Sequence, residues 1–309
     1  MWLILAFFSA ALLGFYDTFK KKALQGNSVI AVLFLNTLFS SLIFIPFIGL
    51  SYFTHVLDGS IFHVAAGGWA MHKYIILKSL IVLTSWALGY FGMKRVPLTI
   101  YGPINATRPV MVLVGALLVF GERLNIWQWL GVFLAVASFF MLSRSSKKEG
   151  IDFRHNKGIF CIVLAAIIGA VSGLYDKYLM AGPANGGVGL DKMMVQSWYN
   201  FYQMIMMGVV LIFTVWQPFS KKKTALAELH WDWSIIFISI FLSAADFVYF
   251  YALSLDGAMI SIVSMIRRGS VLVSFLFGAW VFHEKNLKSK VVDLILVLLG
   301  MVFLYIGSK

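Results

Sequence analysis

Two arginines lie in stretches of the chain that are otherwise apolar. Arg108 stands in PINATRPVMVL, between Thr107 and Pro109, and Arg268 stands in an apolar run near the C-terminus. Each is about ten residues into its run, which is roughly 15 Å along a helix. If these runs cross a membrane, a charge at that depth costs at least about 2.5 to 3.5 kcal/mol. Each guanidinium is therefore expected to face a wet cavity or a counter-ion.

The planar fork of a guanidinium matches the oxygens of a carboxylate or a phosphate. A pair of such groups in a cavity predicts an anionic or zwitterionic solute, and Asn105, one turn before Arg108, adds a neutral hydrogen-bonding group. Two structural alternatives stay open for Arg108. It could form an internal salt bridge, or it could bind carbonyl groups that Pro103 and Pro109 leave without an amide donor.

Three acidic residues are candidates for coupling or gating, and so are Tyr16 and Tyr175, which directly precede two of them. Asp246 is deep in its apolar run, and a carboxyl group in a membrane core binds a proton more readily than one in water. It could couple proton movement to transport, or it could neutralise an arginine. Asp17 and Asp176 stand nearer the ends of their runs, where we expect them to pair with Lys20 and Lys177; a gating role stays open.

Aromatic residues make up 16% of the chain, and several lie within or close to the third, fourth and eighth apolar runs. Amphipathic rings suit a cavity wall for a metabolite that has an apolar body and polar tips. The alternative is that they serve as interfacial anchors or packing. The residues are Trp86, Tyr90, Tyr101, Tyr249 and Tyr251, of which Trp86 and Tyr249 are the candidates for solute contact.

The composition predicts a polytopic membrane protein. Of 309 residues, 61% are hydrophobic and 12% are charged, with a mean hydropathy of +0.87, and this balance excludes an ordinary soluble domain. The net charge of +12 comes from short basic clusters between apolar runs, such as residues 20–22 and 221–223. Such clusters are typical of topology signals and of contacts with membrane lipids, not of nucleic-acid binding.

About 20 helical residues are needed to span a bilayer, and the sequence predicts ten such helices. Their ranges are 2–19, 28–50, 74–93, 98–120, 125–143, 158–180, 193–215, 232–253, 258–282 and 287–307. The fold class is therefore predicted as all-α, with ten transmembrane helices.

The longest polar segment divides these helices five and five, and the two halves align weakly. Residues 5–19 overlay 164–178 at an offset of 159, and the match includes the pairs Gly14/Gly173, Tyr16/Tyr175 and Asp17/Asp176. Further on, Arg108 falls opposite Arg268 at an offset of 160, and Glu122 falls opposite Glu284 at 162. We predict a five-helix repeat over 1–143, a basic linker over 144–157 and a second repeat over 158–309.

Five helices per repeat give the two halves opposite orientations in the membrane. Two equivalent arginines at mid-depth should then approach each other near the pseudo-two-fold axis. Arg267 points roughly 100° away from Arg268 on a regular helix, so we expect only one of the two to line the cavity.

The loop charges predict the orientation. The odd-numbered loops carry 16 Lys and Arg residues and the opposite face carries 4. The positive-inside rule places the odd loops in the cytoplasm and both termini outside it. We expect an integral multi-pass protein of the plasma (inner) membrane of a bacterium.

Three features of the sequence resemble the drug/metabolite transporter superfamily, in its EamA branch. They are the count of ten spans, a Tyr-Asp pair near the end of the first helix of each half, and a Gly-Glu-Arg-Leu turn at 121–124. His283-Glu284-Lys285 stands at the equivalent turn of the second half. The resemblance covers nearly the whole chain. It implies a secondary carrier of metabolites such as amino acids, sugars or nucleotide derivatives, with the small-molecule solute held in a central cavity between the halves.

Other chemistries find little support in the sequence. His55, His63 and His72 are spaced eight and nine apart, which is not ligand spacing on one helical turn. No phosphate-cradling loop, nucleophile elbow or HExxH motif occurs. We therefore expect no metal, no cofactor and no enzymatic activity. The alternatives to a carrier are an intramembrane enzyme acting on a lipid-linked substrate and a membrane sensor that binds without transport.

Overall fold

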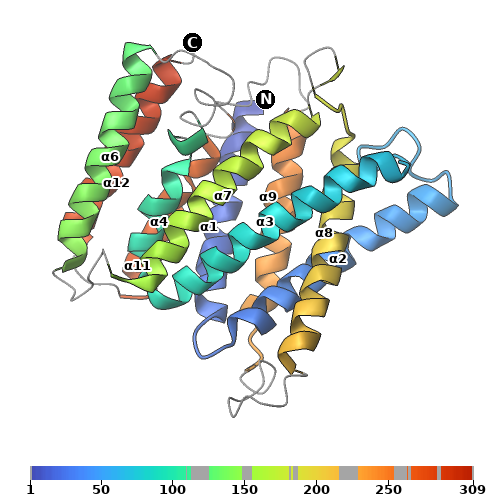
Figure 1. The fold of residues 1–309 in the computed structure, drawn as a ribbon, viewed down its shortest axis with the longest axis horizontal. Coiled ribbons are helices and arrows are strands. Elements are labelled where there is room, and N and C mark those ends of the chain that lie inside the picture. The colour runs from blue at the N-terminus through green and yellow to red at the C-terminus, as the bar shows by residue number, and fades with distance from the viewer. Residues whose placement is uncertain are drawn as a thin grey trace.

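The protein is built from α-helices (Figure 1). The computed structural model describes residues 2–108, 110–112, 125–147, 155–180, 182–183, 187–215, 229–253, 263, 266–283 and 287–307. Across these ranges the regular elements are helical and no strand occurs, which confirms the all-α class.

The helices of the first half are α1 (Trp2–Ala23), α2 (Val29–Phe53), α3 (Trp69–Arg95), α4 (Leu98–Ala106) and α6 (Ile126–Lys147). Those of the second half are α7 (Lys157–Met180), α8 (Lys192–Val215), α9 (Ser234–Leu253), α11 (Ser270–Trp280) and α12 (Leu287–Gly307). Within the described ranges, α1, α2, α3, α7 and α9 are long and apolar enough to cross a membrane.

The outside of the bundle is apolar and its interior is partly polar. Ile4 and Phe7 of α1 are 73% and 64% exposed, whereas Asn36, Gln196 and Gln203 are completely buried. A soluble protein shows the reverse distribution. The helices therefore bury polar side chains among themselves and present apolar side chains outward, as a lipid environment requires.

The helices of the two halves exchange partners. Extensive packing joins α1 to α9 and α3 to α7, so that the first helix of each half lies against the third helix of the other. In addition, α2 packs on α8, and α6 packs on α12 at one edge of the bundle (Figure 1). This exchange is the pattern that a pseudo-two-fold axis between the halves produces.

Glycine and serine allow these helices to approach closely. A Cβ atom added at Gly92 of α3 would lie 2.4 Å from Cγ1 of Ile162 and 2.8 Å from the carbonyl oxygen of Gly158. The Ser85 hydroxyl donates to the Ala165 carbonyl across the same interface at 2.8 Å. Small residues and hydroxyl bonds of this kind hold helices together in lipid, where the hydrophobic effect does not.

The structure corrects two predicted spans, because the helices over 98–120 and 258–282 are interrupted near the candidate arginines. Helix α4 ends at Ala106, and the Thr107 hydroxyl donates to the Ile104 carbonyl at 2.6 Å. Proline has no amide hydrogen to donate to the carbonyl four residues earlier, here that of Asn105, so Pro109 accounts for a break at this point. Helix α11 begins only at Ser270. Residues 109, 113–124, 254–262 and 264–265 lie outside the described ranges.

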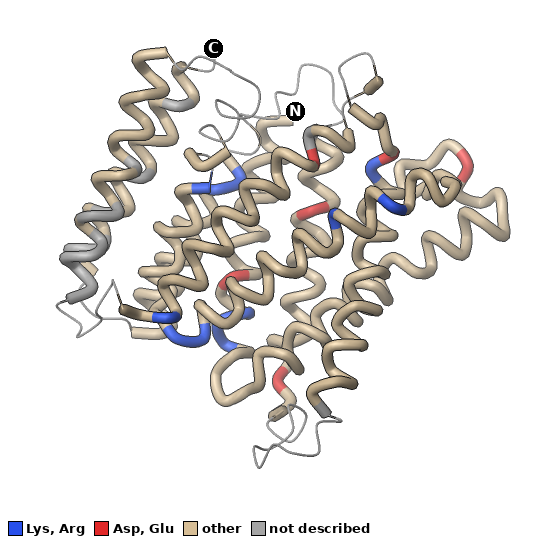
Figure 2. The backbone as a smooth tube through the Cα atoms, in the orientation of Figure 1, with Lys and Arg blue, Asp and Glu red and all other residues tan. Residues whose placement is uncertain are grey.

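Charge is distributed unevenly along the bundle. Figure 2 shows basic residues gathered at the end opposite the two chain termini, and charged residues partway along the helices. At the basic end, Lys21 donates to the Met93 carbonyl at 2.7 Å and Lys94 donates to the Asn27 carbonyl at 2.6 Å. These lysines thus tie the end of α3 to the end of α1 and the loop that follows it, in addition to carrying a topology signal.

We predict that Gly92→Ala lowers the free energy of unfolding by about 1 to 3 kcal/mol, because the new methyl group meets the α7 backbone. Thermal unfolding in detergent micelles would measure the loss. Gly49→Ala in α2 is the matched control, since a Cβ there meets no atom within 4 Å. Equal stability of the two variants would contradict the close approach of α3 and α7.

Candidate functional site

A cavity of about 160 Å³ lies among helices of both halves. Its wall comes from α1, α3, α4, α7, α8 and α9 and from the segment before α11. The structure brings nine of the ten predicted site residues into this wall: Arg108, Arg268, Asn105, Trp86, Tyr249, Asp246, Asp17, Asp176 and Tyr16.

Tyr175 is the predicted site residue that does not line the cavity. Its hydroxyl donates to the carbonyl oxygen of Tyr74 at 3.2 Å, and its ring stacks on Tyr178 with centroids 5.9 Å apart. Tyr16, the equivalent residue of the first half, is buried in the cavity wall. The repeat match therefore identified equivalent positions on α1 and α7 whose surroundings differ.

Each acidic residue of the wall has a cationic partner. Asp17 pairs with Lys20 at 2.6 Å, as the sequence predicted. Asp176 pairs with Lys78 of α3, whereas the sequence had predicted Lys177 as its partner. The side chain of Lys177 lies outside the described part of the structure. The Asp176–Lys78 ion pair joins α7 to α3. The spacing of residues along one helix cannot predict a partner on another helix.

Asp246 of α9 is held through both of its oxygens. One carboxylate oxygen accepts from the guanidinium of Arg267, and the other accepts from the Tyr199 hydroxyl at 2.8 Å. The same guanidinium donates to the Ser9 hydroxyl at 3.2 Å and lies 4.2 Å from the centre of the Tyr249 ring. Asp246 therefore neutralises an arginine, one of the two roles that the sequence left open.

Arg267 and Arg268 both line the cavity, so the expectation that only one of them would do so was wrong. The backbone here is not a regular α-helix. The Gly269 amide donates to the Ile266 carbonyl at 2.8 Å, and the Leu272 amide donates to the Gly269 carbonyl at 2.9 Å. Such i to i−3 bonds belong to a tighter turn than that of an α-helix, with three residues per turn.

The arginine that corresponds to Arg108 by its surroundings is Arg267 rather than Arg268. Arg267 follows Arg108 by 159 positions, the offset that relates Asp17 to Asp176. Each of the two guanidiniums lies near a serine whose hydroxyl donates to a carbonyl across an interface between the halves. Arg108 approaches Ser85 at 3.5 Å, and Arg267 approaches Ser9 at 3.2 Å.

Arg108 and Arg268 have no carboxylate partner among the described residues. The nearest contacts of Arg108 are long, to the Ser85 hydroxyl at 3.5 Å and to the Ala165 carbonyl at 3.4 Å. That carbonyl belongs to α7, not to backbone that a proline has freed in α4. The Nε atoms of both arginines are buried and, within the described ranges, without a hydrogen-bond partner.

The charges of the described wall therefore do not balance. It contains three aspartates and five cationic side chains. Three of the cations, Lys20, Lys78 and Arg267, are taken by the aspartates. Arg108 and Arg268 are left as two unneutralised guanidiniums in a site that is mostly shielded from water. A group with negative charge is the chemical complement of such a site.

Lys20 closes the cavity toward the basic end of the bundle. It is 3% exposed, donates to the Tyr101 hydroxyl at 3.2 Å and lies 4.2 Å from the centre of the Tyr16 ring. The rings of Tyr90 and Tyr101 surround it at 5.3 and 5.0 Å. Cation–π contacts of this kind stabilise a desolvated ammonium group. The Asp176 side chain, by contrast, is 20% exposed.

Lys20 and Lys78 line the cavity but were not predicted as site residues from the sequence. Lys20 belongs to the basic cluster 20–22, and such clusters are typical of cytoplasmic loops. Its charge was therefore interpreted as a topology signal and not as part of a binding site. Lys78 stands inside the predicted span 74–93, and a lysine within an apolar span was the signal that could have identified it.

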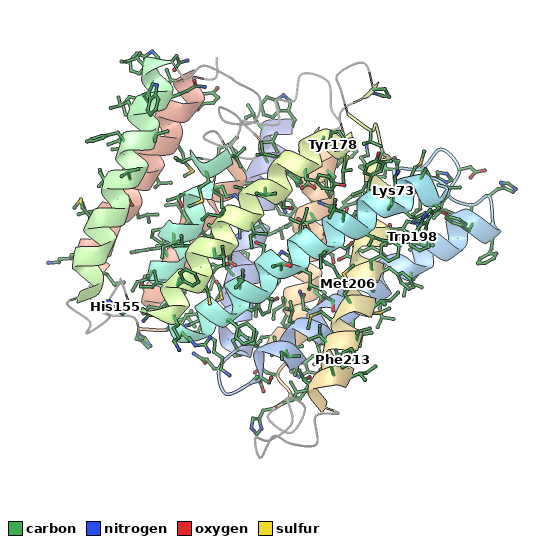
Figure 3. All side chains as sticks on the ribbon, viewed as in Figure 1. Lys73, His155, Tyr178, Trp198, Met206 and Phe213 are labelled. Carbon is green, nitrogen blue, oxygen red and sulfur yellow. The ribbon has the colours of Figure 1, made fainter. Side chains whose placement is uncertain are left out.

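A second polar and aromatic cluster lies outside the cavity. Trp198 of α8, labelled in Figure 3, meets the ring of His72 edge-on at 4.7 Å. The Tyr202 hydroxyl lies 2.9 Å from Nδ1 of His72. Across the described residues, no group of three or more His, Cys, Asp or Glu side chains could hold a metal ion.

Comparison with known proteins supplies the family. The model of the EamA-like transporter family matches residues 1–144 and 156–306. The chain belongs to the EamA-like transporter family. One solved crystal structure shares the fold of this EamA-like protein over 98% of this chain and 96% of its own, with a TM-score of 0.63 and 13% sequence identity. No curated protein matches the sequence of this EamA-like chain.

Family membership and the apolar, helical structure together make this EamA-like protein a multi-pass integral membrane protein and a transporter of the drug/metabolite transporter superfamily. Its two matched stretches give it the two-repeat architecture of the family. Members of the family are transporters, which favours transport over the intramembrane enzyme and the membrane sensor.

We predict that Lys78→Met destabilises the protein by about 3 to 5 kcal/mol, because it leaves the Asp176 carboxylate without its partner at a largely buried site. Thermal unfolding in detergent measures the loss. Adding Asp176→Asn to Lys78→Met should restore most of the stability, since the unpaired charge is then gone. If the double variant is as unstable as the single one, the ion pair is not the reason for the loss.

Proposed function

We propose that this EamA-like transporter is a secondary carrier of a small organic anion or zwitterion, and that Arg108 and Arg268 bind the anionic group of the solute. The observation that carries the proposal is the charge balance of the cavity. Every acidic side chain of the described wall is paired, and these two guanidiniums are not.

The hydrogen-bonding state of the two arginines supports this role. The buried Nε atoms of Arg108 and Arg268 have no partner in the described structure. A buried donor without an acceptor is costly, and more so when it is charged. A carboxylate or phosphate in the cavity supplies both the missing acceptors and the missing charge, whereas a neutral solute supplies only acceptors.

The rest of the wall favours a small solute. Trp86, Tyr90 and Tyr249 offer aromatic faces to an apolar body, and Asn105 offers a neutral hydrogen-bonding group. The cavity of about 160 Å³ is smaller than the 300 to 1,000 Å³ typical of sites for drug-sized ligands. Among metabolites, an amino-acid or sugar derivative fits this volume better than a complete nucleotide.

The packing between the two halves supports a mechanism of alternating access. We propose ten transmembrane helices in two inverted five-helix repeats, one over 1–143 and one over 158–309, that rock against each other around the cavity. Asp17 and Lys20, beside Tyr16, form the gate at the basic end. Asp176 and Lys78, in the region of Tyr175, form the gate at the other end.

The basic residues at one end of the bundle support an orientation in the membrane (Figure 2). We propose that this end faces the cytoplasm of a bacterium and that both termini lie outside the cytoplasm. The closed Lys20 cluster then seals the cytoplasmic side, and the more exposed Asp176 lies toward the outside.

Proton coupling is proposed for Asp246. This carboxylate shares Arg267 with the cavity, so an anionic solute that reaches Arg267 competes with Asp246 for it. A displaced carboxylate at a buried site favours its protonated form. Binding of the anion and uptake of a proton by Asp246 are thereby linked.

We predict that proteoliposomes take up a carboxylate or phosphate compound and not its amide or alcohol analogue. Arg108→Ala and Arg268→Ala should each weaken apparent affinity roughly 10- to 100-fold, because each removes charge-assisted hydrogen bonds. The matched control is Arg95→Ala, since Arg95 is exposed at the end of α3 and lies outside the cavity wall. Tracer uptake at several solute concentrations measures the affinity.

Three results would each contradict part of the proposal that the protein is a carrier of an anionic solute. Equal uptake of the neutral analogue would remove the role of charge. Solute binding with no translocation would favour the sensor, and conversion of the solute to a new product would favour the enzyme.

We also predict that Asp246→Asn abolishes accumulation of the anion against its gradient when a pH gradient is imposed. An amide cannot gain or lose the coupled proton, although exchange of internal for external solute should persist. Uptake with and without a pH gradient, in the wild type and in Asp246→Asn, measures this. The proton mechanism is wrong if wild-type uptake is indifferent to the gradient.

A further inference from the structure

Arg108 lies directly against the backbone of α7. A Cβ atom added at Gly169 would fall 2.5 Å from Cζ of Arg108, 2.7 Å from Nη1 and 2.8 Å from Nε. Real Cβ atoms essentially never approach other atoms so closely. The guanidinium thus occupies the volume in which any other residue at position 169 would place its side chain.

The equivalent position in the first half is not a glycine. Position 169 follows Ala10 by 159 positions, the offset that relates Asp17 to Asp176 and Arg108 to Arg267. Ala10 is buried in α1, next to Ser9, which binds Arg267. Helix α1, which has an alanine at this position, therefore contacts an arginine that is paired with Asp246. Helix α7, which has a glycine, contacts an arginine without an acidic partner among the described residues.

We propose that Gly169 is a positioning residue for the solute site, because the absence of its side chain lets the Arg108 guanidinium lie on α7 with its donors directed into the cavity. This inference rests on the proposed role of Arg108 in binding an anion. Gly169 touches no solute itself and acts through Arg108. The long contacts of Arg108 to Ser85 and Ala165 are too weak to hold the guanidinium without this surface.

A methyl group at position 169 should move the guanidinium and leave the fold intact. The atoms that it would meet are the far end of a flexible side chain, not backbone. The Gly169→Ala protein is therefore expected to unfold at close to the wild-type temperature. Its arginine fork would be displaced from α7, and the geometry that matches an anion would be lost.

The first measurement needs no solute. Phenylglyoxal modifies accessible arginines, and mass spectrometry of peptides reports the rate at Arg108 in the full-length protein in detergent. We expect faster modification in Gly169→Ala than in the wild type. Gly208→Ala is the control, since a Cβ there meets only Phe34 at an ordinary 3.7 Å. An unchanged rate at Arg108 in Gly169→Ala would overturn the inference.

The second measurement uses inorganic phosphate as the probe anion and thermal stabilisation as the readout. We expect Gly169→Ala to raise the phosphate concentration for half-maximal stabilisation about tenfold, and Gly208→Ala to leave it unchanged. In an Arg108→Ala background, adding Gly169→Ala should have no further effect, since the group that it displaces is gone. Independent, additive effects would show that Gly169 acts through helix packing and would contradict the inference.

The two measurements separate the failure of each proposal. In one outcome, phosphate does not stabilise the wild type, but the modification rate of Arg108 rises in Gly169→Ala. Gly169 then positions Arg108, and the proposed anion site is wrong. If phosphate stabilises the wild type and Arg108→Ala loses this effect while Gly169→Ala keeps it, the anion site stands and the role of Gly169 is wrong.

Discussion

Pairing between aspartates and cations determines what the central cavity can bind. Asp17, Asp176 and Asp246 each hold one cationic side chain, and two of these pairs connect different elements of the bundle. Since a charge within a membrane protein must be neutralised or hydrated, the pairs account for all the acids of the described cavity wall and for only part of its cations. In the proposed function, the unneutralised remainder, Arg108 and Arg268, gives the cavity its affinity for negative charge. The gates, the aromatic wall and the proposed coupling all depend on this balance.

The balance is maintained by the packing between the halves. Helices α1 and α9, and likewise α3 and α7, approach closely enough that serine hydroxyls reach carbonyl groups across the interface. Two cavity arginines lie on these interfaces, next to Ser9 and Ser85. Interruptions of the helices at Thr107 and before Ser270 bring the arginine-bearing segments into the cavity wall. In the proposed alternating-access mechanism, relative movement of the halves changes the surroundings of these charged groups.

The sequence predicted those features that leave a mark on a single segment. Helices appear as apolar runs of membrane length, and Arg108 and Asp246 stand out as charges inside such runs. Contacts between helices leave no such mark, which is why Lys78 was missed as the partner of Asp176. The rule of 100° per residue predicted that only one of Arg267 and Arg268 would line the cavity, whereas both of these long side chains do. The proposed role of Gly169 could not be predicted from the sequence, because it depends on the space that the missing side chain leaves for the Arg108 guanidinium.

The central claim is that the cavity selects for negative charge. It is tested most directly by the thermal unfolding of purified wild-type protein with matched anionic, neutral and cationic forms of the same small metabolites. The account predicts that anionic forms raise the unfolding temperature in a concentration-dependent way and that their neutral and cationic counterparts do not. Equal stabilisation by the neutral or cationic forms would contradict it.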